Sequence, residues 1–146
     1  MSSPNLKQLE NAHALFTDLN ANEWEALEQL LSPEFKHCQY LPGTITPPDG
    51  KETRGKEEWM GALKHTFVAL FDHITFRPPL DVIHGTDKVA FHLKSDGMLK
   101  SGLEYINEYM ITFHFDGEKI IKLNEFVDSK YSSAFYAALR EQSKSN

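Results

Sequence analysis

The sequence predicts an α+β domain, in which helices cover one face of a curved antiparallel sheet. Apolar residues recur at helical spacing before Asp72, alternate with period two after it, and return to helical spacing near the C-terminus. The 146 residues match the common size of one domain and can bury a substantial core. We therefore expect a single domain over residues 1–146.

The composition argues against several classes of partner. The formal net charge is −6, and no run of basic residues is present to meet phosphates, so nucleic acid and anionic membranes are poor partners. The only cysteine is Cys38, which rules out an internal disulfide, and no apolar stretch is long enough to cross a bilayer. These features are typical of a cytoplasmic protein.

Two helices are expected at the N-terminus. The first covers residues 4–20, because Pro4 suits a first helical turn and apolar residues follow at helical spacing. A second, shorter helix begins after Asn22, which can cap it, and stops at Ser32, because the residue before a proline resists helical geometry.

The next part of the chain predicts a short strand over 35–41, a loop over 42–55 and a third helix over 56–71. The loop holds three Pro and three Gly, and such a loop is either a functional rim or a flexible connection. Trp59 and Phe67 lie on the apolar stripe of the helix. A stripe of this kind usually packs a core, and these two rings could also line a substrate pocket.

The C-terminal half predicts a meander of strands followed by a closing helix. Pro78–Pro79 interrupts the first strand and places it at a bend or an edge of the sheet. The expected strands cover 74–84, 88–94, 103–115 and 120–128, with turns at 85–87, 95–97 and 116–119, and the helix covers 131–142.

The strand over 103–115 carries apolar residues on both faces. One face can pack against the helices, and the other needs a partner, most simply a second copy of the same sheet. We therefore expect a homodimer. The residues expected near its contact are Met110, Thr112, His114 and Phe126.

The order of elements resembles the nuclear transport factor two-like superfamily. Asn107-Glu108-Tyr109-Met110, Asp116-Gly117-Glu118-Lys119-Ile120 and the segment 124–129 are similar to fungal SnoaL-like proteins, as are the positions of His92 and Pro42. The resemblance implies a cone-shaped mixed sheet wrapped by three N-terminal helices, with a C-terminal helix. It implies no single activity, because isomerases, polyketide cyclases, dehydratases, epoxide hydrolases and binding domains share this fold.

The resemblance also implies a role for Glu125. SnoaL-type cyclases place an acid at this position of the last strand, and limonene epoxide hydrolases keep a carboxylate there. Those hydrolases add an Arg and an Asp roughly where this chain has His92 and Lys94. Their mechanism is therefore not implied for this protein.

The position of Glu125 within this resemblance favours a catalytic pair of Glu125 and His92. Alternation places Leu123 and Val127 beside Glu125, an apolar neighbourhood that suits a general acid or base. His92 could meet Glu125 across the interior and share its proton. Three other interpretations stay open, namely a solvent-facing Glu125, a Glu125 paired with Lys94, and a His92 that simply packs in the core.

Four further residues are candidates for substrate binding. Tyr109 and Asn107 share one face of their strand and could donate hydrogen bonds to a carbonyl or enolate oxygen. Tyr40 and Cys38 share a face of the first strand and could reach the same pocket. A lone buried cysteine is more often a small hydrophobic residue than a functional one.

No cofactor is expected. The seven histidines form no His-Glu-x-x-His pattern, and the sequence has no glycine-rich phosphate loop. We therefore interpret the protein as a cofactor-independent isomerase or cyclase, without metal. Its substrate would be an apolar polyketide, terpenoid or meroterpenoid intermediate of specialised metabolism. The alternative is a non-catalytic module of the same fold that binds a hydrophobic ligand or another protein.

Overall fold

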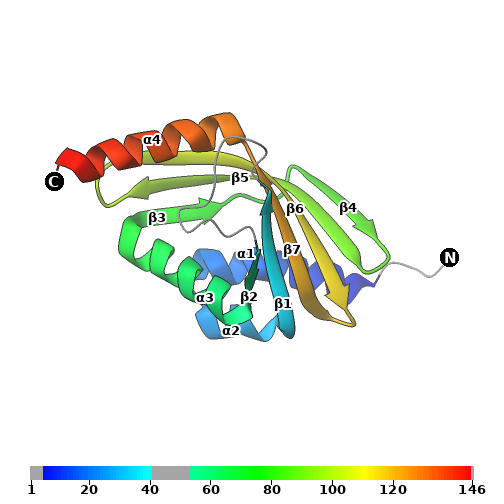
Figure 1. Ribbon diagram of the computed structural model, residues 1–146. Helices are drawn as coiled ribbons and strands as arrows, with labels where there is room; N and C mark the ends of the chain where they lie inside the picture. Colours follow the sequence, from blue (N-terminus) through cyan, green and yellow to red (C-terminus); the bar gives the residue numbers. More distant parts are fainter. Residues whose placement is uncertain (1–4, 41–52, 146) are drawn as a thin grey trace.

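The computed structural model describes residues 5–40 and 53–145, and of Tyr40 only the backbone (Figure 1). The predicted loop over 42–55 lies outside the described residues except for its last three. The elements are α1 (Leu6–Ala21), α2 (Trp24–Gln29), β1 (Leu31–Tyr40), β2 (Thr53–Gly55), α3 (Lys56–His65), the π-helix η1 (Thr66–Leu70), β3 (Phe71–Phe76), β4 (Asp81–Gly85), β5 (Lys88–Leu99), β6 (Glu104–Asp116), β7 (Lys119–Val127) and α4 (Ser129–Ser145).

The strands form one mixed sheet in the order β2-β1-β7-β6-β5-β3, and β4 also pairs with β5. β1 runs parallel to β7, and every other pair among the described strands is antiparallel. A strand from the beginning of the chain therefore lies beside the last strand. This pairing positions the candidate site described below.

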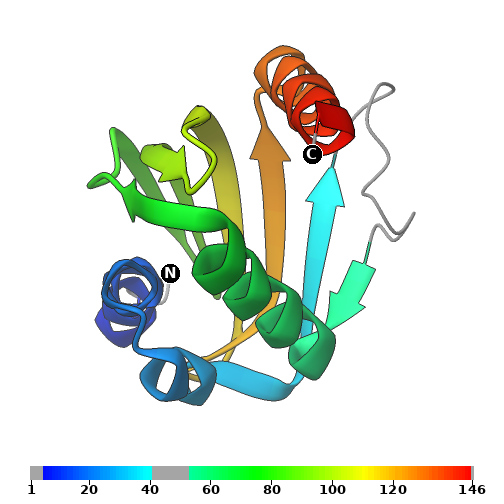
Figure 2. The same cartoon turned by 90° about the vertical axis from the view of Figure 1, so that its left-hand side faces the viewer.

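The N-terminal helices lie on one side of the curved sheet, and α4 crosses one end of it (Figure 2). We call the face toward α1 and α3 the inner face and the opposite one the outer face. Phe16 of α1 packs on Phe91 and Phe113 of the inner face, with ring centroids 6.1 and 6.0 Å apart. The α+β fold class and its mixed curved sheet are confirmed.

The first two helices differ from their predicted bounds for local reasons. α1 begins after Asn5, whose Oδ1 accepts the Lys7 N–H at 3.0 Å. It ends at Ala21, because the next residue, the C-cap Asn22, takes the left-handed conformation with φ 57°. α2 ends at Gln29, not at Ser32, because the chain enters β1 directly. The register of β1 against β7 shifts between Leu31 and Lys36, which accommodates Pro33 within the strand.

The third helix is shorter than predicted, because η1 follows α3 and β3 already begins at Phe71. The predicted turn at 95–97 is wrong, since β5 continues through it to Leu99. A Cβ atom on Gly97 would lie 3.1 Å from both the His73 carbonyl oxygen and the Phe71 ring, so the glycine serves close packing of β3.

The predicted strand over 74–84 is divided in two. β3 ends at Phe76 and β4 begins at Asp81, and Pro78–Pro79 lies between them, as the expected bend requires. Both short strands pair with β5, one along each half of its length.

Candidate functional site

A buried histidine–glutamate pair joins β1 to β7 on the inner face. His37 Nε2 lies 3.0 Å from Glu125 Oε2, and only 6% and 20% of the two side chains are exposed. The residues are 88 positions apart in sequence, and the parallel pairing brings them together. The His37 ring stacks on Trp59 of α3, with a centroid distance of 5.5 Å and an interplanar angle of 27°.

The surroundings of Glu125 are mostly apolar. Leu123 and Val127 share its face of β7, and the buried Ile111 lies opposite it on β6. Glu125 Oε1 has no hydrogen-bond partner among the described residues, and neither has the buried Nδ1 of His37. One carboxylate oxygen is therefore held by His37, while the other is available to exchange a proton with a ligand.

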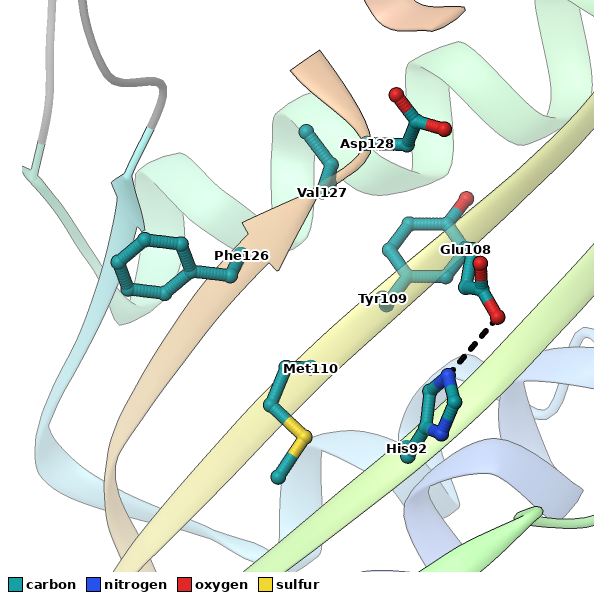
Figure 3. A pocket seen from close by; sticks show the side chains of 7 residues that line it. All are labelled: His92, Glu108, Tyr109, Met110, Phe126, Val127 and Asp128. Atoms are coloured by element: carbon teal, nitrogen blue, oxygen red, sulfur yellow. Dashed lines mark hydrogen bonds and ion pairs between the residues drawn. The ribbon is translucent and has the colours of Figure 1, made fainter. Parts of the chain in front are cut away.

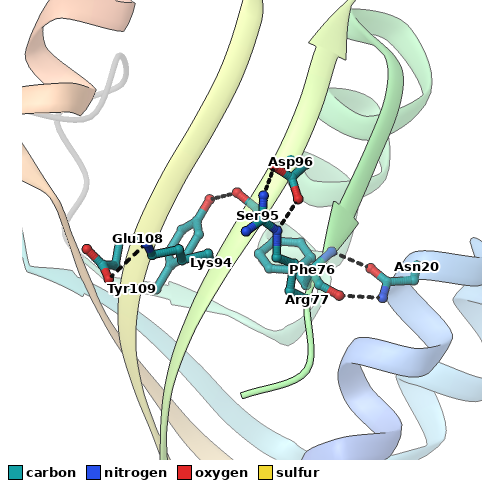
Figure 4. Close-up of polar contacts among 8 residues, drawn as sticks. All are labelled: Asn20, Phe76, Arg77, Lys94, Ser95, Asp96, Glu108 and Tyr109. Atoms are coloured by element: carbon teal, nitrogen blue, oxygen red, sulfur yellow. Dashed lines mark hydrogen bonds and ion pairs between the residues drawn. The ribbon is translucent and has the colours of Figure 1, made fainter. Parts of the chain in front are cut away.

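A chain of polar side chains runs across the inner face next to this pair. Tyr109 Oη forms hydrogen bonds of 2.9 Å with Ser95 Oγ and 2.8 Å with Tyr105 Oη (Figure 4 shows the first). Asn107 Nδ2 donates to Tyr105 Oη and to Ser132 Oγ of α4, both at 3.0 Å. These groups bring several hydrogen-bond donors to one region of an otherwise apolar interior.

Burial keeps the tyrosines of this region protonated. It raises the pKa of Tyr105, Tyr109 and Tyr136 above the usual value, and the negative charge of Glu125 adds to the effect at each of them. For Tyr136 the positive charge of Arg54 acts in the opposite direction. The tyrosines on β6 and α4 therefore lie within electrostatic reach of Glu125 and are hydrogen-bond donors at neutral pH.

His92 does not meet Glu125, so this prediction is wrong. It lies on the outer face, where its Nε2 is 2.9 Å from Glu108 Oε1 and where 39% and 44% of the two side chains are exposed (Figure 3). The reason is the alternation of β5, whose inner face is filled by Phe91 and Leu93. His92 therefore points away from the core.

The outer-face pair borders a shallow hollow of about 330 Å³ that is open to solvent. Apolar side chains of Met110 and Phe126 line it, together with the acidic Glu108 and Asp128 (Figure 3). Lys94 Nζ lies 3.9 Å from Glu108 Oε1, so the lysine that we considered as a partner of Glu125 is a partner of Glu108 instead.

Cys38 also lies on the outer face, contrary to its predicted place in the pocket. It follows His37 on β1 and pairs with Asn124, whose amide meets His114 at 3.3 Å. The Cys38 sulfur lies 3.7 Å from Thr53 Oγ1. Tyr40 belongs to β1 and its backbone pairs with Phe126, but its side chain lies outside the described residues.

A model of the SnoaL-like domain family matches residues 12–123, which is most of the chain. The chain belongs to the SnoaL-like domain family. The predicted resemblance is thereby confirmed at the level of the family. A comparison with curated proteins found no match.

Solved structures with the same fold include two proteins from Penicillium and one from a bacterium. PrhC from Penicillium brasilianum has a TM-score of 0.81 and 16% identity over 97% of this chain and 93% of that one. BvnE pinacolase from Penicillium brevicompactum has a TM-score of 0.76 and 21% identity, over 99% of this chain and 100% of that one. An NTF2-like protein of unknown function from Burkholderia pseudomallei has a TM-score of 0.75 and 11% identity, over 92% of this chain and 98% of that one. At these identities the likeness shows the fold.

In this SnoaL-like domain the remaining predicted site residues fall into two groups. Tyr109 and Asn107 lie in the polar chain on the inner face, and Trp59 lies beside His37. Phe67 packs among other rings of the core, 6.0 Å from Trp24 and 5.9 Å from Phe71 between ring centroids. A role in substrate binding stays a prediction for all four.

Sequence reasoning missed three residues of the SnoaL-like domain's site. His37 shares its face of β1 with the buried Phe35, and this alternation was the available signal. Arg54, whose side chain is 12% exposed, fell in the predicted loop. Tyr105 shares its face of β6 with Asn107 and Tyr109, so alternation was the available signal for it as well.

The described parts of the SnoaL-like domain contain no group of three His, Cys, Asp or Glu side chains that could hold a metal ion. None of the helices within residues 5–40 and 53–145 is long and apolar enough to span a membrane.

Proposed function

We propose that this protein is a cofactor-independent isomerase or cyclase that uses Glu125 to move a proton of an apolar, oxygen-containing substrate. The observation that carries this proposal is the buried pair of His37 and Glu125, 3.0 Å apart, with Oε1 of the carboxylate unpartnered by any described residue. A carboxylate held in an apolar interior is a suitable general base.

The chemistry needs no change of oxidation state. Glu125 Oε1 removes a proton from a carbon next to a carbonyl group, and the electron pair of that C–H bond moves toward the carbonyl oxygen to give an enolate. His37 holds the other carboxylate oxygen, which fixes the direction of the base. Return of the proton to a different carbon completes an isomerisation. Alternatively, the enolate carbon attacks a second carbonyl carbon of the same molecule and closes a ring, while the π pair of that C=O bond moves to its oxygen, which takes the proton from Glu125.

The interior favours a hydrophobic substrate. The pair is surrounded by the apolar side chains of Trp59, Leu123, Val127 and Ile111. Further aromatic rings belong to the same hydrophobic core. The names of two similar structures, a pinacolase from Penicillium brevicompactum and a putative isomerase from Bacillus subtilis, support rearrangement without redox chemistry on this fold. We therefore propose a polyketide, terpenoid or meroterpenoid of specialised metabolism as the substrate class.

Proton exchange into a simple ketone tests the proposal without knowledge of the natural substrate. 2-Tetralone is apolar and enolisable, and the loss of its α-proton signals in D2O can be followed by NMR. Wild-type protein should accelerate this exchange over buffer, and Glu125→Gln, which keeps the shape but not the base, should not. Exchange at the buffer rate with wild-type protein, or equal acceleration by both proteins, would contradict the proposal and favour a binding module.

A further inference from the structure

We propose that Tyr105 supplies the hydroxyl group that binds the substrate oxygen, as the last donor of the polar chain on the inner face. The ligand of this site is a planar apolar molecule with an enolate or phenolate oxygen, or the carbonyl from which the enolate forms. The inference rests on the proposed function for the identity of the ligand, but its geometry is independent of it. It replaces Tyr109, which the sequence favoured.

Asn107 fixes which groups donate and which accept in the polar chain. Its Oδ1 accepts the backbone N–H of Glu108 at 2.9 Å, so the other end of the amide must be the NH2 group. That group donates its two protons to Tyr105 Oη and Ser132 Oγ. Tyr105 is therefore an acceptor toward Asn107.

Counting protons places the free donor at Tyr105. Ser95, Tyr109 and Tyr105 carry three hydroxyl protons but share only two hydrogen bonds, so one proton is left over. Ser95 is fully buried and Tyr109 is 4% exposed, and a spare proton on either would be a buried donor without an acceptor. Tyr105 is the half-buried member. The order is therefore Ser95 to Tyr109 to Tyr105, and the free O–H belongs to Tyr105.

This arrangement makes Tyr105 a strong and well-directed donor. Its oxygen accepts from both Tyr109 and Asn107, and accepting hydrogen bonds polarises the O–H that remains. The ring packs between Phe71 and Phe135, with centroid distances of 5.6 and 4.7 Å, which limits its rotation. Burial holds the pKa of Tyr105 above its usual range, so the proton stays on the oxygen at neutral pH.

The charge of Glu125 determines at which stage of the reaction the site can bind an oxyanion. A negative charge on Glu125 raises the pKa of Tyr105, and the same charge would repel an anion bound to the Tyr105 hydroxyl. When Glu125 accepts the α-proton, its negative charge disappears as the charge on the substrate oxygen appears. Tyr105 thus meets an oxyanion only at the stage at which Glu125 is neutral.

Binding of 2-naphthol tests the inference, because its anion is a stable analogue of an aromatic enolate and its absorbance differs from that of the neutral form. We expect wild-type protein to bind 2-naphthol as its anion, with the phenolic proton transferred to Glu125 so that the charge of the carboxylate is neutralised. Tyr105→Phe should weaken this binding by about tenfold to a hundredfold, the worth of a hydrogen bond to a charged group. Tyr131→Phe is the matched control, because the Tyr131 hydroxyl is occupied by the Ile106 N–H and lies outside the polar chain. It should bind as wild type does.

The Glu125→Gln variant separates this inference from the proposed function. It imitates the protonated carboxyl group, so it should bind the naphtholate more tightly than wild type even though it cannot exchange protons. Unchanged binding by a folded Tyr105→Phe, or no naphtholate binding by wild type and by Glu125→Gln, would overturn the inference. Failure of the tetralone exchange with retained, Tyr105-dependent naphtholate binding would overturn the proposed function alone.

Discussion

The two faces of the sheet each carry a histidine–glutamate pair, and the pairs differ only in their surroundings. Nε2 to carboxylate distances are 3.0 Å for His37–Glu125 and 2.9 Å for His92–Glu108. Inside, Trp59 stacks on the histidine and little of either side chain is exposed. Outside, about two fifths of each side chain is exposed to water, and Lys94 adds a positive charge. Distance alone therefore does not identify a site, whereas burial and neighbours do.

The largest expected effect separates the two glutamates. Glu125→Gln should reduce the rate of tetralone exchange by about two to four orders of magnitude, the usual worth of a positioned base. Glu108→Gln removes the same charge from the same sheet and should leave the rate within about twofold, because water already reaches that pair. A similar loss of rate in both variants would show that overall charge, not the buried carboxylate, drives the exchange.

The histidines should differ in their contribution to stability. His37→Ala leaves a mostly buried carboxylate without its partner and removes the ring that packs on Trp59, so the free energy of unfolding should fall by about 1–3 kcal/mol. His92→Ala should change it by less than about 0.5 kcal/mol. Urea denaturation followed by circular dichroism measures both. Equal losses would contradict the difference in burial on which the comparison rests.

Much of the site could be predicted from alternation within single strands. Alternation placed Leu123 and Val127 beside Glu125 and put Asn107 and Tyr109 on one face of β6, and the family resemblance favoured an inward-facing Glu125. β6 alternates along its whole length, whereas β7 has a register shift opposite His114 and Phe115, so its parity at Glu125 depends on Leu123 and Val127. The family resemblance added the cone-shaped arrangement, which no single element reveals.

The partner of Glu125 could not be found in this way, because it depends on a pairing between distant strands. β1 meets β7 in parallel, and nothing local to either strand specifies that neighbour. On β1 the candidates for the pocket were Cys38 and Tyr40. The apolar Phe35, which is buried, instead marks the opposite face, which carries His37. On β5 we considered His92 for its chemistry, although Phe91 and Leu93 already occupy the inner face.

The outer face should hold a second copy of the chain, which the inner face cannot. Ile106, Met110 and Phe126 are exposed there by 39%, 37% and 48%, a large apolar area to leave in water. Phe126→Asp should weaken self-association by about tenfold or more without affecting the His37–Glu125 pair. Sedimentation equilibrium at micromolar concentration checks this, and a wild-type monomer of 16.7 kDa would rule out the homodimer.

The smallest expected effect is an alkaline loss of stability that originates on the inner face. Burial raises the pKa of Tyr109 above 10, so above that pH the unfolded chain loses the proton while the folded chain keeps it. Stability that is fully present below pH 10 is therefore lost as the pH rises, by up to about 1.4 kcal/mol per unit for each such tyrosine. Tyr109→Phe should flatten this slope in urea titrations between pH 9 and about 11. An identical slope in both proteins would place the cause elsewhere.

The parallel pairing of β1 with β7 also has a consequence for the nascent chain. His37 leaves the ribosome 88 residues before Glu125, so the edge of β1 that faces β7 waits without its neighbour while most of the protein is made. Such an edge can pair with other chains during that time. Docking of β7 covers it and completes the His37–Glu125 pair in the same step. A polypeptide released before β7 would thus lack Glu125 and keep an open strand edge, so premature termination should yield aggregation and not a soluble, partly folded domain.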